Sequence, residues 1–188
     1  RANLAIRDLL TIGVDFMIHG PVPDNHYFHY VAAGHPNPDF ENRLRIYEPF
    51  SAPLDGRGEI STEAAQLLVV LPHPEPPGIL ERIRKQFPDL SVIRTTSPLD
   101  GRSVWVEIFN PAVSKSLTVK WLCGQLGISE NRVCAVGNDY NDLDLLQWAP
   151  QRYVVANAPE DLRAVFPVVP ANDQDGMVEA ARLWLRRL

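Results

Sequence analysis

The stretch Val133-Cys-Ala-Val-Gly-Asn-Asp-Tyr-Asn-Asp142 decides the fold, because it joins a short apolar strand to a strongly polar turn. The apolar residues over 133–136 predict a buried strand, and Gly137 predicts the turn that follows it. Apolar residues return at helical spacing between Leu143 and Trp148. The polar side chains therefore stand between a strand and a helix, at the edge of a parallel sheet where α/β proteins bind ligands.

Acids and amides crowd this turn. Four of its five positions from 138 to 142 are Asn138, Asp139, Asn141 and Asp142. Capping a helix needs only one acid or amide, and like charges so close repel each other unless a cation or hydrogen-bond donors neutralise them. We therefore predict a metal and phosphate site here. The alternative is a turn whose polar residues only cap the following helix.

A second feature opens the helix that we predict over residues 115–127. Ser114 is a good N-cap, whereas Lys115 places a cation in the first turn, where it opposes the helix dipole. An anion held jointly by Lys115 and the free amides of that helix end would reverse the unfavourable effect. Together with the acidic turn, this conflict favours Lys115 as a phosphate clamp. The alternative is a solvated surface lysine whose cost is tolerated.

Composition excludes several classes of protein. The 188 residues are 45% hydrophobic and 22% charged, which is typical of an ordinary globular protein. A formal net charge of −5 argues against nucleic acid as a partner. No apolar stretch of about 18 residues occurs, and the amino terminus has no signal-peptide layout. We therefore expect no membrane partner and a cytoplasmic location.

The rhythm of predicted elements changes near residue 110. Before it, we expect an α+β unit with helices over 2–11, from about Asp24, and over 79–87, strands over 14–18, 67–71, 90–94 and 104–109, and an irregular region over 35–65. After it, helices over 115–127, 142–148, 159–164 and 176–187 alternate with strands over 133–136, 153–155 and 167–169. This alternation predicts a parallel sheet, so we divide the chain into domains 1–109 and 110–188.

These motifs, in this order, resemble the carboxyl-terminal half of haloacid dehalogenase (HAD) superfamily phosphatases, with the closest resemblance to the Cof-type group that has a large α/β cap. The segments that resemble the family are Val106–Ile108, Ser114–Lys115, Gly137–Asp142, Ala156–Ala158 and Asp175–Gly176. The resemblance implies an α/β fold class. Residues 110–188 become the carboxyl-terminal part of a Rossmann-like parallel sheet core, and residues 1–109 an α+β cap that sets substrate specificity.

The resemblance also implies roles for single residues. In that family a lysine holds the transferring phosphoryl group, which makes Lys115 a catalytic and phosphate-binding residue. The family's Gly-Asp-x-x-Asn-Asp turn makes Asn141 a substrate contact and Asp142 an acid of the Mg²⁺ site. This chain has Asn138 where the family has its first turn Asp, with an acid displaced to Asp139. Either residue can offer the ion an oxygen ligand.

A second departure is larger. No Asp-x-Asp-x-Thr motif occurs in the 188 residues, although the family places its nucleophilic Asp there. The resemblance implies a Mg²⁺-dependent phosphomonoester hydrolase for a small phosphorylated metabolite such as a sugar phosphate, acting through an aspartyl phosphate on an Asp that this chain lacks. We expect the chain to be part of a longer polypeptide, inactive alone and prone to self-association. The alternatives are an inactive binding or regulatory module and a phosphotransferase.

Overall fold

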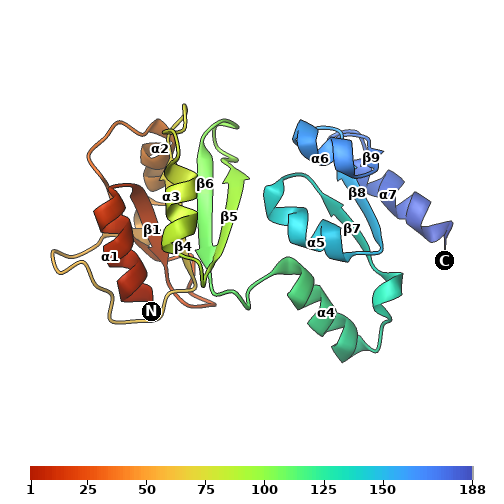
Figure 1. Cartoon of the computed structure of the whole chain (residues 1–188), viewed down its shortest axis with the longest axis horizontal. Helices are drawn as coiled ribbons and strands as arrows, with labels where there is room; N and C mark the ends of the chain where they lie inside the picture. The colour runs from red at the N-terminus through yellow and green to blue at the C-terminus, as the bar shows by residue number, and fades with distance from the viewer. Residues whose placement is uncertain (188) are drawn as a thin grey trace. The chain divides into compact units, whose positions relative to one another are not determined.

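A computed structural model describes residues 1–187. The chain divides into two units at Pro111, and the described residues of these units are 1–111 and 112–187. The boundary lies two residues after the one expected from the sequence. Each unit has its own sheet and its own hydrophobic core, and Figure 1 labels their helices and strands.

The first unit is built on a six-stranded sheet with the strand order β3-β2-β1-β4-β6-β5. Neighbouring strands are antiparallel except β2 and β3, which are parallel. The strands are β1 Asp15–His19, β2 Phe28–Val31, β3 Ser51–Pro53, β4 Gln66–Leu71, β5 Ser91–Thr96 and β6 Val104–Phe109. The helices are α1 Ala2–Ile12, α2 Pro38–Ile46, α3 Ile79–Gln86 and the short 3₁₀ helix η1 Glu48–Phe50.

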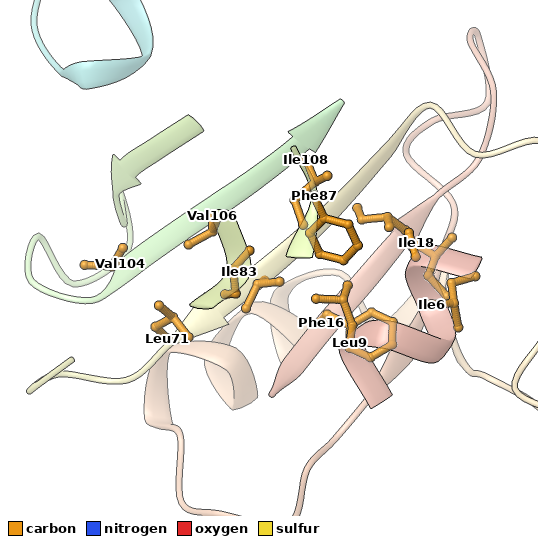
Figure 2. Packing of buried hydrophobic residues seen from close by; sticks show 13 residues of the cluster. Ile6, Leu9, Phe16, Ile18, Leu71, Ile83, Phe87, Val104, Val106 and Ile108 are labelled. Carbon is orange, nitrogen blue, oxygen red and sulfur yellow. The ribbon is translucent and has the colours of Figure 1, made fainter. Parts of the chain in front are cut away.

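Alternation along the strands sends apolar side chains to both faces of this sheet. On one face, Phe16 and Ile18 of β1 pack with residues of α1 and α3, as Figure 2 shows. Ile6, Leu9 and Ile83 are the fully buried anchors from these two helices. On the opposite face, β1 contributes to a second cluster, which also includes a side chain of α2; its buried members are Met17, Phe28, Phe40, Leu68, Val70 and Trp105.

Two expectations for this unit are wrong. The helix expected from about Asp24 is a turn followed by β2, whose aromatic and β-branched residues favour a strand and pair with β1. The irregular region over 35–65 contains α2, η1 and β3. Asn37 caps α2 by accepting a hydrogen bond from the Phe40 amide at 3.3 Å, and Pro38 occupies the first helical position. The prolines around Asn37 thus start a helix rather than prevent one.

The second unit contains the predicted parallel sheet, with strand order β7-β8-β9. The strands are β7 Cys134–Gly137, β8 Gln151–Val155 and β9 Val168–Val169. The helices are α4 Lys115–Leu126, α5 Leu143–Trp148, α6 Glu160–Val165 and α7 Gly176–Leu185, with 3₁₀ helices η2 Glu130–Arg132 and η3 Tyr140–Asp142. Leu146, Val154 and Ala180 are fully buried at the centre of its core. The α/β fold class expected from the sequence is confirmed.

Candidate functional site

The polar turn follows β7 directly, and its backbone folds back on itself. Asp139 is the N-cap of η3, and its Oδ1 accepts a hydrogen bond from the Tyr140 amide at 2.8 Å. Asp142 ends η3, and its Oδ2 accepts a hydrogen bond from the Asn138 amide at 2.9 Å. The Asp142 carboxylate therefore lies beside the end of β7, where it bonds an amide four residues earlier in the chain.

Gly137 makes this return possible. A Cβ atom at position 137 would lie 2.7 Å from Cβ of Asp142 and 2.8 Å from Cδ1 of Leu146. Both distances are too short for real side-chain contacts, so only glycine lets η3 and α5 pack this closely on the end of β7. The glycine that the sequence assigns to a turn thus also shapes the site.

Lys115 and Asp142 form an ion pair at the carboxyl end of β7. The Lys115 ammonium donates a hydrogen bond to Oδ1 of Asp142, across 27 residues of sequence. The lysine side chain is 46% exposed, whereas the aspartate side chain is only 11% exposed. Both Asp142 oxygens are thus engaged, one by the Lys115 ammonium and the other by the Asn138 amide.

A second carboxylate holds the start of α4. Oδ2 of Asp144 accepts hydrogen bonds from the Ser114 hydroxyl at 2.6 Å, the Ser116 hydroxyl at 2.9 Å and the Ser116 amide at 3.1 Å. Burial disfavours the charged form of Asp144, but these bonds and one from the Leu145 amide outweigh it and hold its pKa below the usual value. Asp144 is therefore an ionised carboxylate, and it accepts hydrogen bonds from the two residues that flank Lys115.

These contacts change the explanation for the lysine at a helix start. Ser114 caps α4 as expected, accepting a hydrogen bond from the Leu117 amide at 3.1 Å. The Ser116 amide is occupied by Asp144, so it is not available to an outside anion. Two carboxylates of the chain itself, Asp142 and Asp144, offset the cation in the first turn. An anionic ligand would therefore be held by the Lys115 side chain rather than by the Ser116 amide.

Asp144 is the site residue that sequence reasoning missed. It stands in the first turn of α5, where an acid is expected simply because it favours the helix dipole. The serines on both sides of Lys115 are its partners, but they lie 28 and 30 residues earlier in the sequence. The pair of serines flanking Lys115 is the one signal that could have pointed to a carboxylate acceptor, and the sequence reasoning did not use it.

The remaining predicted residues differ in exposure. Asn138 is exposed, Asn141 is half-buried, and Asp139 is buried. Within residues 1–187, no group of three or more His, Cys, Asp or Glu side chains could hold a metal ion by itself. A site for Mg²⁺ usually needs only one or two carboxylates beside water and substrate oxygens, and every donor at this turn is a hard oxygen. The turn therefore fits Mg²⁺ in donor chemistry, with Asn138 and Asp139 both open as the ligand beside Asp142.

Comparison with known proteins gives a family match over most of the chain. A sequence model of the haloacid dehalogenase-like hydrolases matches residues 46–180. A candidate phosphatase of Haemophilus influenzae is 27% identical over 143 residues, which are 74% of this chain and 52% of that protein. The chain thus spans about half the length of this relative.

Solved structures match the fold. The protein SMU.1108c of Streptococcus mutans superposes with a TM-score of 0.73 at 18% identity, covering 99% of this chain and 68% of that one. A HAD subclass IIB sugar phosphatase superposes with a TM-score of 0.69 at 15% identity, covering 97% of this chain and 66% of that one. At such identities the likeness concerns the fold.

None of the helices within residues 1–187 combines the length and apolarity needed to cross a membrane.

Proposed function

The chain belongs to the haloacid dehalogenase-like hydrolase family, and from that premise we propose that it supplies the phosphate-binding part of a Mg²⁺-dependent phosphomonoester hydrolase. The substrate that we propose is a small phosphorylated metabolite such as a sugar phosphate. A phosphatase among the sequence relatives and a sugar phosphatase among the fold relatives support this class.

The observation that supports this proposal most directly is the Lys115–Asp142 pair at the carboxyl end of β7. A half-exposed lysine side chain at this edge of a parallel sheet can bind a phosphoryl oxygen while Asp142 keeps it oriented. Asn141, in the same turn, is the proposed contact to the rest of the substrate. The Ser114 and Ser116 bonds to Asp144 hold the backbone of Lys115 in position for this task.

The proposed chemistry is transfer of the phosphoryl group to an aspartate, followed by hydrolysis of the aspartyl phosphate by water. We propose that this aspartate lies outside residues 1–188, because no Asp-x-Asp-x-Thr motif occurs in them and the chain spans only half of its relative. Lys115 would offset negative charge on the phosphoryl oxygens in both steps. Mg²⁺ held by Asp142 together with Asn138 or Asp139 would neutralise further charge on these oxygens.

The test uses the polypeptide encoded by the whole gene, assayed for Mg²⁺-dependent hydrolysis of a generic aryl phosphate. Replacing Lys115 with Ala should lower kcat by about 100-fold or more, because a charge that stabilises the transition state is lost. Lys120→Ala is the matched control, since Lys120 is an exposed lysine of the same helix. Near-normal kcat in Lys115→Ala would refute the assigned role.

The 188-residue chain by itself should show no turnover above background. Measurable hydrolysis by this chain would contradict the proposal that the nucleophile lies elsewhere. If the whole-gene polypeptide binds phosphate without hydrolysing any ester, an inactive binding module is the better description. The presence of Asn138 at the position where the family has its first turn Asp would then explain the lost activity.

A further inference from the structure

Lys115 is held at both ends by carboxylates of one short stretch of the chain. Its ammonium donates to Asp142, and the serines on either side of its backbone donate to Asp144. The two acids stand at the end of η3 and in the first turn of α5. The side chain and the backbone of the lysine are therefore fixed to the same turn.

Asp144 fills a small anion site at the start of α4. The Ser114 hydroxyl, the Ser116 hydroxyl and the Ser116 amide all donate to one of its oxygens, Oδ2. A helix N-terminus with such converging donors commonly binds an anion. Here the anion is a side chain of α5, so the start of α4 is fastened to α5.

Capping of α4 does not by itself explain these bonds. Ser114 already caps the helix by accepting a hydrogen bond from the Leu117 amide at 3.1 Å. The bond from the Ser116 amide to Asp144 serves the helix start as well, but the two hydroxyl bonds are not needed for capping. They set where the start of α4 stands relative to α5.

Core packing does little to hold the start of α4. Among the described residues of this helix, Cys123 alone is buried, and it lies in the second half. The first turn contains Lys115, whose side chain is 46% exposed. A lysine side chain is long and flexible, so the place of its ammonium depends on where the backbone is fixed. The hydrogen bonds to Asp144 supply that fixed point.

We propose that Asp144 is a positioning residue, which sets the place of the Lys115 ammonium through the two flanking serines and does not contact the substrate itself. Its effect on turnover rests on the phosphoryl-binding role proposed for Lys115, whereas its effect on the Lys115–Asp142 pair does not. The opposite explanation is that the carboxylate blocks an anion site that a phosphate would otherwise use. The two explanations predict opposite effects of replacing Asp144.

The first test observes the lysine directly in the 188-residue chain by NMR. The sequence has only three lysines, and of these Lys115 alone forms an ion pair among residues 1–187. Its ammonium should therefore give a ¹⁵N signal distinct from those of Lys85 and Lys120. Asp144→Ala should move this signal toward the other two, because the ion pair loosens. Asp173→Ala, at an exposed carboxylate of the same unit, should leave it in place.

Asp144→Asn separates hydrogen bonding from charge. It removes the same charge as Asp144→Ala, but its amide oxygen still accepts hydrogen bonds from Ser114 and Ser116. The Lys115 signal should therefore shift less in Asp144→Asn than in Asp144→Ala. No shift in Asp144→Ala, or equal shifts in the two variants, would overturn the proposal.

The second test measures turnover of an aryl phosphate by the polypeptide encoded by the whole gene. Asp144→Ala should lower kcat by about tenfold or more, because a displaced ammonium stabilises the transferring phosphoryl group poorly. Asp144→Asn should lose less, and Asp173→Ala should be near normal. If Lys115→Ala abolishes turnover whereas Asp144→Ala does not lower it, the positioning role fails and the proposed function stands. If Lys115→Ala keeps near-normal kcat, the proposed function fails, and the NMR signal alone decides the positioning role.

A double variant shows whether Asp144 acts through Lys115. Adding Asp144→Ala to Lys115→Ala should cause no further loss of the residual kcat, because the residue that Asp144 positions is already gone. A merely structural role would lower kcat by the same factor in both backgrounds, and that result would overturn the proposal. Stronger inhibition of Asp144→Ala than of wild type by inorganic phosphate would also overturn it, because the carboxylate would then be blocking an anion site.

Discussion

Gly137 shows how one missing side chain shapes the candidate site. With no Cβ at position 137, Asp142 and Leu146 approach the end of β7 closely, and the Asp142 carboxylate reaches both the Asn138 amide and Lys115. The same glycine thus serves the packing of the second unit and the geometry of the ion pair. Replacing Gly137 should therefore both destabilise the second unit and disturb the geometry of the ion pair.

We expect Gly137→Ala to lower the free energy of unfolding of the second unit by about 1–3 kcal/mol, because the added methyl group overpacks against Asp142 and Leu146. Urea unfolding measures the change. Gly124→Ala is the control: Gly124 lies within α4 with nothing near its missing Cβ, so alanine there should stabilise the helix by up to about 1 kcal/mol. Equal effects of the two substitutions would contradict this steric account.

At the scale of elements, the start of α4 depends on a carboxylate from α5. Asp144 accepts three hydrogen bonds from the two serines that flank Lys115. This contact compensates for a lysine in the first helical turn, which would otherwise weaken the helix. Hydrogen bonds thus join the start of α4 to the start of α5, although the two are distant in sequence.

The substitution Asp144→Asn tests this dependence through pH. The pKa of Asp144 is lowered in the folded chain, so its charge adds stability above the ordinary carboxyl range and loses that contribution as pH falls below about 4. We expect the variant to be less stable near pH 7 by about 1 kcal/mol, a value reduced for partial exposure. The difference from wild type should shrink as the pH is lowered through that range.

Chemical unfolding at several pH values measures this difference. The control is Asp173→Asn, which removes an exposed carboxylate of the same unit that lies in a turn. If both variants lose the same stability near pH 7, or if the Asp144→Asn difference grows in acid, the proposed bonding is refuted.

Two elements of the first unit also show why local patterns mislead. The aromatic run Phe28–Val31 pairs with β1 at a register that only the folded sheet defines. The prolines on either side of Asn37 lie in the region over 35–65 that we expected to be irregular, yet Pro38 suits the first position of α2. Asn37 also donates to the buried Asp15 carboxylate at 2.7 Å, a contact across 22 residues that anchors the start of α2 to β1.

At the scale of the whole molecule, the two separate cores should unfold separately. Ile83 is fully buried in the first core and Leu146 in the second. We expect two thermal transitions by calorimetry. Ile83→Ala should lower the transition temperature of the first unit, and Leu146→Ala that of the second. Each substitution should reduce the free energy of unfolding of its own unit by about 2–5 kcal/mol. Each variant serves as the control for the other, and a shift of both transitions by either substitution would contradict independent cores.

Self-association of the isolated chain is a further prediction at this scale. The strand β7 ends its sheet, because β8 is its only partner strand among the described residues. The helix α4 exposes Leu117, Trp121 and Leu126, with 63% of Trp121 accessible. Open edges and exposed apolar side chains favour pairing between molecules. We expect dimers or larger species by light scattering, and a monodisperse monomer would contradict this.

Replacing Trp121 with Glu should reduce this association if the exposed apolar side chains of α4 drive it. Val165→Glu is a matched control at an exposed apolar position of α6 in the same unit. An equal reduction by both substitutions would point to a general effect of added charge rather than to the apolar side chains of α4.

The sequence by itself determined the strand–turn–helix around Gly137, the parallel alternation after residue 110 and the identity of the polar residues in the turn, because these features depend on neighbours a few positions apart. Only the tertiary structure decided which charges meet. Lys115 pairs with Asp142 and the flanking serines pair with Asp144 across 27 to 30 residues. These pairings depend on which loops reach the same edge of the sheet. Residues separated by 27 to 30 positions are brought together only by the folded chain, so no local sequence pattern predicts their contact.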